Sequence, residues 1–476
     1  MTKRLLFRVD ANQEIGYGHL TRCLSIADSI DNFEITFFST DNLETYFKDL
    51  KNEKYHFIQL KESKDFLSII KLHDIVIIDG YNFDSSYHEA IHSLGAKIIS
   101  IDDLANRKLL ADVILNPTPA LSSQNYICPI YTQFYIGLDY ALLRKAFLEL
   151  AQKGSVTKSS NSMMICFGGS DPLNITLRAL KEVIKSEKFL AIHCVLGPGY
   201  VFFESLIEFE SENIHFHKNL QEAEMALLME TCEFGILPCS GILLEGITAK
   251  MKIISGYYIE NQTFVYQQHL KMKTFVDAKN FSSSDITSAL LVLNETIPPS
   301  TLIDGHSIAG IHKIIKQISS EDEYSIREAD ITDCNLTFSW ANHPTTRQFS
   351  FNKEKIDWEE HLKWFSKKIQ SPFCYYLVLE MKSNLVGSIR FDILDKIATI
   401  SYLVAPDYHG LGIGNILFRK GLIALEKKFT MNELDTIQGF VFKDNIPSVK
   451  TFERYNFKQQ INQDTFLFTK KFTKND

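Results

Sequence analysis

The chain has 476 residues, more than a single hydrophobic core usually holds, so we expect two or three domains. Hydrophobic residues make up 45% and charged residues 23% of the chain, as in ordinary globular proteins. The formal net charge is −8 and there is no long basic run, which argues against nucleic acid and anionic membrane surfaces as partners.

The sequence carries no strong signal for export, membrane insertion or metal binding. The apolar run near the N-terminus is too short for a signal peptide, and no segment approaches the ~20 apolar residues of a membrane span. The eight cysteines occur singly, and several, such as Cys166 and Cys194, lie in apolar runs, so we expect reduced core thiols. We therefore expect a cytoplasmic protein without a metal site. The sequence does not predict its oligomeric state.

The stretch 4–30 predicts a strand, a glycine turn and a helix. Leu5–Val9 is a short apolar run suited to a buried parallel strand, and Gly16 and Gly18 flank the turn before the helix. In open α/β sheets, ligands bind beyond the carboxyl ends of the strands. His19 falls at this place, at the positive end of a helix, which makes it a candidate functional residue. A packing or capping histidine is the alternative.

Strands and helices continue to alternate through the first 155 residues, which predicts a doubly wound parallel sheet. The expected strands cover residues 33–39, 74–79, 97–101 and 112–115, with a helix near 86–94. Polar residues recur at the strand ends, where they serve either as turn formers or as functional groups. They are Asp10, Asp79, Asp102, Asp103 and Asn116.

Residues 156–318 repeat the pattern, with strands expected at 163–167, 191–196, 234–237 and 252–255. The loop 168–172 leads into a helix and offers an anion site, although it lacks the Gly-Lys-Ser/Thr of a Walker loop. The turn 238–241 leads into a second helix that carries Glu245.

Two such halves, the second with a small-residue turn and a glutamate four residues into the helix, resemble the GT-B nucleotide-sugar fold. The resemblance implies that Glu245 accepts hydrogen bonds from the ribose of UDP and that amides near Ser240 and Gly241 face the diphosphate. A structural glutamate on the helix surface is the alternative for Glu245.

An ordered set of motifs resembles one family more narrowly: the UDP-2,4-diacetamido-2,4,6-trideoxy-β-L-altropyranose hydrolases of pseudaminic acid biosynthesis. The set comprises Arg8-x-Asp10, Gly16-x-Gly18-His19, Arg22-Cys23, Asp102-Asp103-Leu104, Asn116, Gly168-Gly169-Ser170-Asp171-Pro172, Glu245 and Asn261-Gln262. The resemblance spans about residues 1–315. It departs at 238–241, where relatives often carry a more glycine-rich turn.

For this family we expect His19 to act as the general base toward water, with Asp10 as its orienting partner. The diphosphate would be held by loop amides without a metal, and the free sugar released with inversion. The substrate-binding residues that the resemblance implies are Arg8, Gly16, Tyr17, Gly18, Tyr81, Asp103, Asn116, Gly169, Ser170, Asp171, Ser240, Gly241, Glu245, Asn261 and Gln262.

A different pattern follows the polar run 319–323, which we interpret as a joint. Strands are expected at 324–327, 375–380, 385–393, 397–404 and 438–442, and helices at 356–369 and 415–429. Short connections make the middle three strands an antiparallel meander. The meander runs into His409-Gly410-Leu411-Gly412-Ile413-Gly414 and a helix. This is not the dinucleotide fingerprint, because its third glycine would fall on Asn415.

This region, 323–476, resembles the GNAT acetyltransferases, which are α+β domains with a mostly antiparallel sheet. The resemblance implies that acetyl-CoA binds as acetyl donor, with its pyrophosphate on the glycine loop. The implied binding residues are Leu403, Val404, His409, Gly410, Leu411, Gly412, Ile413, Gly414, Asn445, Ser448 and Phe452. Phe452 replaces the tyrosine that commonly donates a proton in this family. Tyr402, Tyr408 and Tyr455 are unranked substitutes.

The resemblances together imply a bifunctional enzyme that acts on UDP-amino sugars: an acetyltransferase for the 4-amine of UDP-4-amino-4,6-dideoxy-N-acetyl-β-L-altrosamine and a hydrolase for the acetylated product. One alternative is a GT-B glycosyltransferase with an accessory acetyltransferase. Another is a regulator that binds nucleotide sugar and acetyl-CoA. We also expect the two activities to be separable near 319–323, since neither candidate site includes a residue from the other side.

Overall fold

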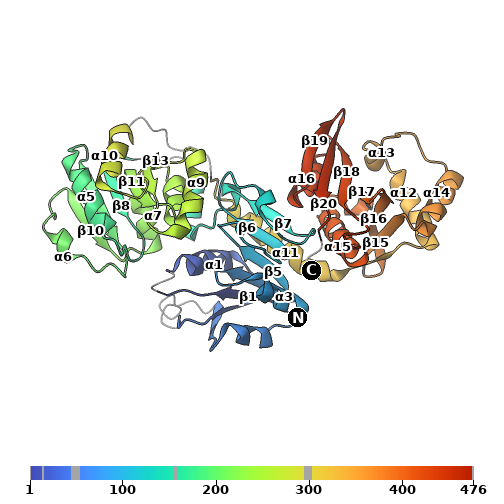
Figure 1. The fold of residues 1–476 in the computed structure, drawn as a ribbon, viewed down its shortest axis with the longest axis horizontal. Helices are drawn as coiled ribbons and strands as arrows, with labels where there is room; N and C mark the ends of the chain where they lie inside the picture. Colours follow the sequence, from blue (N-terminus) through green and yellow to red (C-terminus); the bar gives the residue numbers. More distant parts are fainter. Residues whose placement is uncertain (1, 13–15, 44–53, 154–157, 294–302, 474–476) are drawn as a thin grey trace. The chain divides into compact units, whose positions relative to one another are not determined.

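The computed structural model describes residues 2–12, 16–43, 54–153, 158–293 and 303–473. The chain divides into two compact units (Figure 1). The first contains residues 1–107, 114–126 and 135–314, and the second contains residues 108–113, 127–134 and 315–476. The second unit therefore includes two short segments from the first third of the chain.

The first unit contains two sheets in which the strands follow the same order, although Val113 of β6 and Gln133 and Phe134 of β7 fall within the second unit. In the seven-stranded sheet the order is β3-β2-β1-β4-β5-β6-β7, and in the six-stranded sheet it is β10-β9-β8-β11-β12-β13. The pairs β1–β2, β1–β4, β2–β3 and β4–β5 are parallel, as are all five pairs of the second sheet. This order reverses direction between β1 and β4 and between β8 and β11, which is where doubly wound sheets bind ligands.

The strands and helices expected for this unit form close to their predicted bounds. The unit also contains shorter strands and helices that were not predicted. The strands of the first sheet are β1 (Lys3–Val9), β2 (Phe33–Ser39), β3 (Tyr55–Gln59), β4 (Ile75–Asp79), β5 (Lys97–Ile101), β6 (Val113–Asn116) and β7 (Gln133–Ile136). Those of the second are β8 (Ser159–Cys166), β9 (Ala191–Leu196), β10 (Ile214–Lys218), β11 (Cys232–Pro238), β12 (Lys252–Gly256) and β13 (Val276–Asp277). The helices are α1 (Gly18–Ser29), α3 (Ser85–Ser93), α4 (Lys145–Gln152), α5 (Ile175–Lys185), α6 (Glu204–Ile207), α7 (Glu222–Thr231), α8 (Gly241–Thr248), α9 (Thr263–Lys271), α10 (Ser283–Val292) and α11 (Ser307–Ser320).

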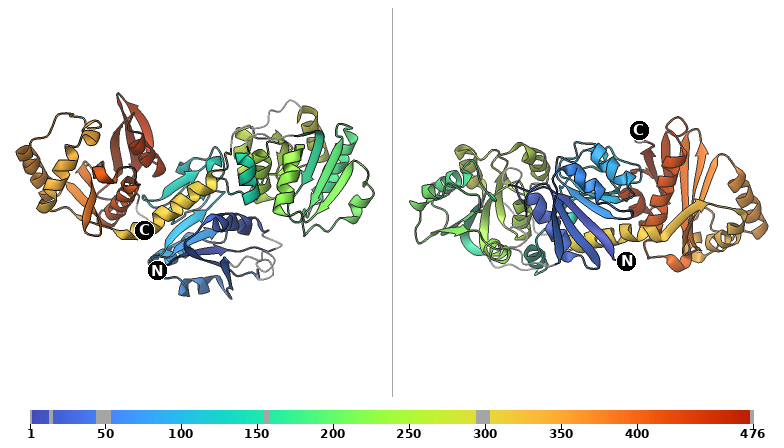
Figure 2. Two further views of the ribbon diagram at one scale, coloured as in Figure 1. Left: turned by 180° about the vertical axis from the view of Figure 1, so that it is seen from behind. Right: turned by 90° about the horizontal axis from the view of Figure 1, so that it is seen from below.

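Helices cover both faces of the second sheet (Figures 1 and 2). Alternate residues of β8 point to opposite sides, so Met164 packs in one cluster with α7 and α8, and Met163 packs in another with α5 and α10. Because both faces are buried there, the inner part of β8, residues 163–166, is a continuous apolar run.

The second unit contains a seven-stranded sheet of order β14-β15-β16-β17-β18-β20-β19. All its pairs are antiparallel except β17–β18. Its strands are β14 (Tyr324–Glu328), β15 (Cys374–Met381), β16 (Asn384–Leu394), β17 (Ile397–Val404), β18 (Thr436–Phe442), β19 (Lys458–Asn462) and β20 (Thr465–Lys471). Its helices are α12 (Cys334–Ala341), α13 (Pro344–Arg347), α14 (Trp358–Gln370), α15 (Ile413–Lys428) and α16 (Ile446–Arg454).

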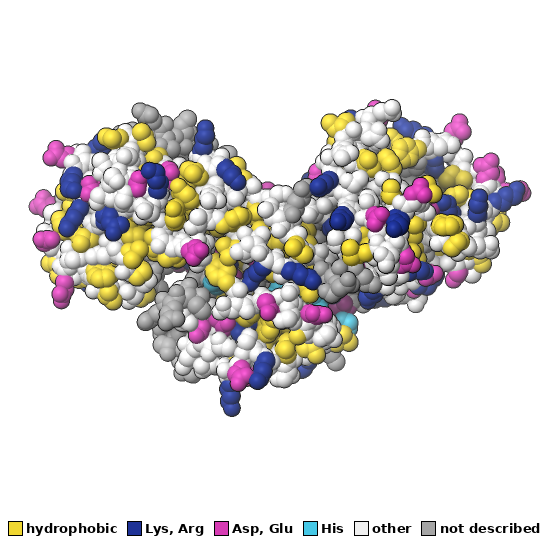
Figure 3. All heavy atoms as spheres, in the orientation of Figure 1, with side chains coloured by type: hydrophobic (Ala, Val, Ile, Leu, Met, Phe, Trp, Pro, Cys, Tyr) yellow, Lys and Arg dark blue, Asp and Glu magenta, His cyan; other side chains and the backbone are white. Residues whose placement is uncertain are grey.

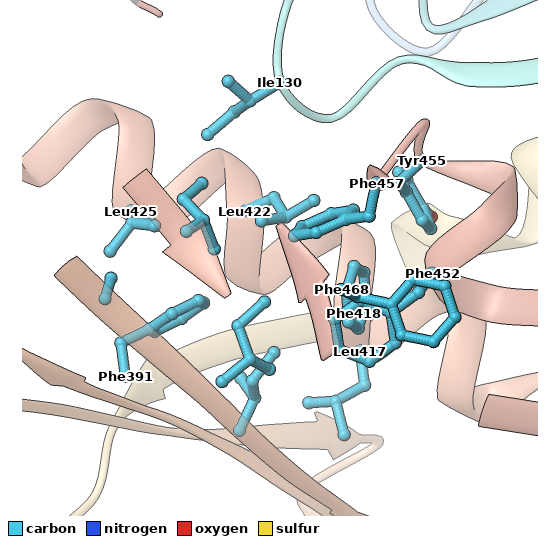
Figure 4. Close-up of a cluster of buried hydrophobic side chains, with 14 of the residues drawn as sticks. Ile130, Phe391, Leu417, Phe418, Leu422, Leu425, Phe452, Tyr455, Phe457 and Phe468 are labelled. Atoms are coloured by element: carbon cyan, nitrogen blue, oxygen red, sulfur yellow. The ribbon is translucent and has the colours of Figure 1, made fainter. Parts of the chain in front are cut away.

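The core of this unit lies between the sheet and the helices α15 and α16. Phe418, Leu422 and Phe452 are among its buried residues, and Ile130, from the early segment 127–134, packs in the same cluster (Figure 4). The early segments thus contribute to the core of the second unit.

The fold class is that expected from the sequence: two parallel-sheet α/β parts followed by an α+β domain of the GNAT type. The polar run 319–323, however, is not an extended linker. Its first residues end helix α11, and Glu321 is buried because it pairs with Arg419.

All eight cysteines are free, and six of them are buried. Of the described residues, no helix is long and apolar enough to cross a membrane. Basic and acidic side chains are interspersed on the face shown in Figure 3.

Candidate functional site

His19 lies at the point in the first sheet where the strand order reverses. It is the second residue of α1, which follows β1, and its ring Nδ1 lies 2.7 Å from Oδ1 of Asp79, the last residue of β4. Both residues are buried. Nη2 of Arg22, which can only donate, also lies 3.0 Å from this nitrogen. Because the contact with the carboxylate, which only accepts, is the shorter of the two, we assign the Nδ1 proton to His19. Nε2 is then the nitrogen that can take up a proton.

Asp79 is also bound by Arg22, one turn further along α1. The Arg22 Nε and Nη2 atoms lie 2.5 and 2.6 Å from the two Asp79 oxygens. Burial alone would raise the pKa of Asp79, but the charges of Arg22 and His19 outweigh burial and hold it well below its usual range. Asp79 is therefore a permanent anion that orients the imidazole of His19.

The carboxylate that contacts His19 is thus Asp79 and not the expected Asp10. Asp10 is held by Arg8, at 2.6 Å, and by the amide of Thr40, at 2.9 Å. Burial raises the pKa of Asp10, but hydrogen bonding to Arg8 and its charge leave it below the ordinary value. The reason is local: Asp10 directly follows β1, two positions after Arg8, and side chains at i and i+2 of an extended chain point to the same side. This pair fastens the ends of β1 and β2.

Other expected residues surround the histidine. Tyr81 packs its ring edge against His19 at 4.9 Å between centroids, and its hydroxyl donates to Asp103 at 3.2 Å. Arg22 also donates to Asp103, at 3.1 Å. Gly16 has a φ of +84° in the turn before α1, and Tyr17 precedes the exposed start of that helix.

Asn116 lies in a separate, fully buried network. Its amide donates to the hydroxyl of Tyr126 at 2.8 Å, and that hydroxyl donates to Asp102 at 2.8 Å. The Asn116 side-chain oxygen accepts from the amide of Thr118. These contacts give Asn116 a structural role at the end of β6.

In the second sheet, the loop after β8 does not present a free helix terminus. Asp171 is buried, and its carboxylate accepts from the amides of Ile175 and Thr176 at 2.9 and 2.8 Å. The expected anion site at the start of α5 is therefore already filled by a side chain of the chain itself. Gly169 and Ser170 remain at the surface of this loop.

The close approach of Gly197 explains why the loop 168–172 contains small residues. A Cβ atom at Gly197 would lie 2.5 Å from the backbone of Gly168 and Gly169, so the two glycine loops pack backbone against backbone. The amide of Gly199 donates to the carbonyl of Gly169 at 2.8 Å.

The start of α8 is a better candidate for binding an anion. Ser240 and Gly241 are exposed, the Ser240 side chain makes no capping hydrogen bond, and a Cβ at Gly241 would meet nothing within 4 Å. The amides of a helix start that lacks a side-chain cap can bind phosphate oxygens.

Glu245 lies one turn into α8 and is buried. Its two oxygens accept from Nε and Nη2 of Arg144 at 2.7 and 2.8 Å. Burial raises the pKa of Glu245, and Arg144 partly opposes this rise. Gln262 is buried and accepts from the amide of Tyr258, whereas Asn261 is exposed.

In the second unit, the glycine loop lies at the start of the 16-residue helix α15. Gly410 and Gly412 have φ values of +78° and +80°, and a Cβ at either would meet nothing within 4 Å. His409 turns away from the loop, with Nε2 3.0 Å from the carbonyl of Val404. The result is an exposed backbone cradle at a helix N-terminus.

Next to this cradle the two parallel strands separate. The pairing of β17 with β18 ends at Ile400 and Gly439, although both strands continue. Tyr402 lies beyond that point, and its hydroxyl donates to Ser448 Oγ at 2.9 Å. Asn445 caps α16 through the amide of Ser448 at 3.4 Å.

The other aromatic candidates have structural surroundings. Phe452 is buried among Phe418, Phe457 and Phe468, so it belongs to the core and does not line an open site. Tyr455 is fully buried and donates to the carbonyl of Asn415 at 3.1 Å.

Sequence reasoning left Arg22 and Asp79 out of the proposed binding and catalytic residues. The signal for Asp79 was present, since it ends a buried strand beside β1. Among the described residues, no group of three or more His, Cys, Asp or Glu side chains could hold a metal ion.

Residues 325–458 match the model of the acetyltransferase (GNAT) domain family, so the second unit contains a GNAT acetyltransferase domain. Over nearly the whole chain, 94%, this protein is 25% identical to the uncharacterized protein MJ1062 of Methanocaldococcus jannaschii, of which the match covers 96%.

Two relatives from Campylobacter jejuni match separate parts. The UDP-2,4-diacetamido-2,4,6-trideoxy-β-L-altropyranose hydrolase is 24% identical over 54% of this chain and 93% of the relative, on the N-terminal side. Acetyltransferase PseH is 29% identical over 27% of this chain and 80% of the relative, on the C-terminal side. The expected likeness to a fusion of these two kinds of protein is confirmed.

Proposed function

We propose that this chain is a bifunctional enzyme of pseudaminic acid biosynthesis. The C-terminal domain transfers the acetyl group of acetyl-CoA to the 4-amine of UDP-4-amino-4,6-dideoxy-N-acetyl-β-L-altrosamine. The N-terminal part then hydrolyses UDP-2,4-diacetamido-2,4,6-trideoxy-β-L-altropyranose to the free sugar and UDP. The separate matches of the two parts of the chain to a UDP-sugar hydrolase and to an acetyltransferase support this assignment.

The observation that carries the hydrolase proposal is the contact between His19 and Asp79. Nε2 of His19 takes a proton from water, and the water oxygen attacks the anomeric carbon. The bond from that carbon to the phosphate oxygen breaks, and UDP leaves with the electron pair. Amides at the start of α8 stabilise the departing diphosphate, and Glu245, held by Arg144, binds the ribose hydroxyls.

In the acetyltransferase, the backbone cradle of Gly410 and Gly412 binds the pyrophosphate of acetyl-CoA. The sugar amine attacks the acetyl carbonyl, the C–S bond breaks, and the nitrogen gives up one proton to solvent as the amide forms. The sulfur leaves as a thiolate that needs a proton. Of the three tyrosines, Tyr402 fits this role, because it lies beyond the last β17–β18 pair, whereas Tyr455 is fully buried. Burial raises the pKa of Tyr402, so its proton is retained at neutral pH.

Incubation of the protein with the UDP-diacetamido sugar in water, without any acceptor, tests the proposal. We expect release of UDP and free sugar at equal rates. Release only after addition of an acceptor would instead indicate a glycosyltransferase, and tight binding without turnover would indicate a regulator. The acetyltransferase is tested separately, with the UDP-4-amino sugar and acetyl-CoA.

A further inference from the structure

Helix α15 is held by two residues that precede it by almost 300 positions. Asn415 donates from its side chain to Oε1 of Gln133 at 3.1 Å. Arg419 pairs with Asp112 and with Glu321. All five residues are buried. Asn415 and Arg419 are four positions apart, so both project from the same face of the helix.

Gln133 and Asp112, which contact this face of α15, are also hydrogen-bonded to each other. The amide of Gln133 donates to the carbonyl of Asp112 at 2.9 Å, so their spacing is fixed by the backbone. Asp112 and Gln133 belong to the segments 108–113 and 127–134, which are part of the second unit. We call this pair the helix clamp.

Apolar and polar contacts hold the clamp in place. Ile130 packs into the core of the unit (Figure 4), and the ring of Tyr131 lies 5.4 Å from the guanidinium of Arg419. Lys470 donates to the carbonyl of Ile130 at 2.9 Å and to that of Tyr455 at 2.7 Å. Tyr455 in turn binds the carbonyl of Asn415, so Asn415 is held from two sides.

The clamp acts at the first turn of α15. Asn415 is the third residue of the helix, and its amide donates to the carbonyl of Gly412 at 3.1 Å. The glycines of the cradle have no side chains that could fix the loop, so its amide directions follow the orientation of the first turn. A shift of this turn would move the amides away from a bound pyrophosphate.

We propose that Gln133 and Asp112 are positioning residues for acetyl-CoA, acting through Asn415 and Arg419 on the glycine cradle. The inference rests on the proposed acetyltransferase function. It means that the CoA site depends on two segments that lie far from the GNAT motifs in the sequence, in the first third of the chain.

The test is the affinity of the full-length protein for acetyl-CoA, measured by calorimetry, together with the kcat and KM of acetyl transfer. In the Gln133→Ala variant we expect Kd and KM for acetyl-CoA to rise about fivefold or more, because one buried hydrogen bond to the first turn is lost. We expect kcat to change less than twofold, because the reacting groups are intact. Gln438→Ala is the matched control: this glutamine also makes a side-chain hydrogen bond in the same domain, to Thr399, but on strand β18.

A second variant, Asn415→Ala, removes the same hydrogen bond from the helix side. It takes the place of Gln133→Ala in the test if that variant folds poorly. The double variant should weaken acetyl-CoA binding no more than the stronger single variant, since both remove one interaction. Unchanged affinity in both single variants would overturn the inference while acetyl-CoA binding by the unsubstituted protein stands. Failure of the unsubstituted protein to bind acetyl-CoA would overturn the proposed acetyltransferase and this inference together.

Discussion

His19 and Asp79 are 60 positions apart in the chain, and Nδ1 of His19 lies 2.7 Å from Oδ1 of Asp79, where the strand order of the first sheet reverses. The contact joins the start of α1 to the end of β4. Since Arg22 holds the same carboxylate by two further hydrogen bonds, the carboxylate is fixed and orients the imidazole.

We expect Asp79→Asn to lower the rate of UDP-sugar hydrolysis by ~10²–10⁴, similar to His19→Asn, because an amide can stabilise the wrong tautomer. Acetyl transfer by the same variants should be unchanged, because the proposed acetyltransferase site lies in the second unit. Rates of UDP release under saturating substrate measure the effect. An Asp79→Asn variant that hydrolyses within threefold of the unsubstituted protein would show that this pair is structural.

Glu245 offers a test of the nucleotide site. Each of its oxygens accepts one hydrogen bond from Arg144, and each has a second lone pair that a ribose hydroxyl can use. Glu245→Ala should weaken UDP binding by ~1.5–3 kcal/mol, the range for hydrogen bonds to charged groups. Calorimetry with UDP measures this change. Glu149→Ala, at an exposed site on α4, is the control, and equal UDP affinity in both variants would make Glu245 a purely structural residue.

Much of the fold follows from local sequence patterns. Apolar runs such as 75–78 and the meander 374–404 gave strands within one or two residues of their observed bounds, because burial on both faces or short hairpins leave few alternatives. The segment 127–134 has no such pattern. Its place in the second unit depends on contacts that link residues about 300 positions apart, which periodicity cannot reveal.

Side-chain partners were harder to predict than strands. His19 was recognised from its place at a helix start, but its partner was expected to be the nearby Asp10. Arg8 binds that carboxylate because it lies only two positions earlier, at the end of β1. Likewise, the pairing of Glu245 with Arg144 spans 101 positions, and the filling of the α5 terminus by Asp171 depends on the bend of its own loop.

Replacement by phenylalanine should have different effects at Tyr402 and at Tyr455. Tyr402→Phe removes the proposed proton donor, so kcat of acetyl transfer should fall ~10²-fold or more with little change in acetyl-CoA affinity. Tyr455→Phe removes the hydrogen bond to the buried carbonyl of Asn415 and should cost about 1–3 kcal/mol of stability. If Tyr402→Phe keeps its kcat over pH 7–9, another group supplies the proton.

The stability of the first unit should decline in mild acid. His269 is buried on α9, and burial lowers its pKa to about 4. In the unfolded chain its pKa is near 6.5, so its neutral form contributes fully above pH 6.5 and the contribution is lost as the pH falls toward 4. Between pH 7.5 and 5.0 this amounts to about 2 kcal/mol.

Urea unfolding at these two pH values measures the loss. In His269→Gln the pH dependence should be smaller, whereas in His56→Gln, at an exposed site, it should equal that of the unsubstituted protein. Burial beside His217 and His215 lowers the pKa of His193 to about 4. His193 therefore makes stability depend on pH in the same direction, and it is present in both variants. Identical pH dependence in all three proteins would exclude His269 as the cause.

The helix clamp also bears on whether the two activities can be separated. A fragment that begins at Glu321 keeps every GNAT motif but loses Asp112, Gln133 and the Ile130 side chain. Arg419 would then be paired with Glu321 alone, and the core around Leu422 would be opened to water. We therefore expect this fragment to aggregate or to lose acetyl-CoA binding, contrary to the expectation from the motifs alone.

The full chain allows a sharper version of this test, because the segment 127–134 contains two isoleucines in opposite surroundings. Ile130 is fully buried in the core of the second unit, whereas Ile127 is 65% exposed. Ile130→Ala should lower the stability of the acetyltransferase unit by about 2–5 kcal/mol, the cost of removing a buried side chain and leaving a cavity. Ile127→Ala should change it by less than about 0.5 kcal/mol. Thermal unfolding followed with and without acetyl-CoA assigns the transition to this unit, since only its transition shifts with the ligand. If Ile130→Ala and Ile127→Ala unfold alike, and the fragment from Glu321 binds acetyl-CoA as tightly as the full chain, the early segments are dispensable and the acetyltransferase folds without them.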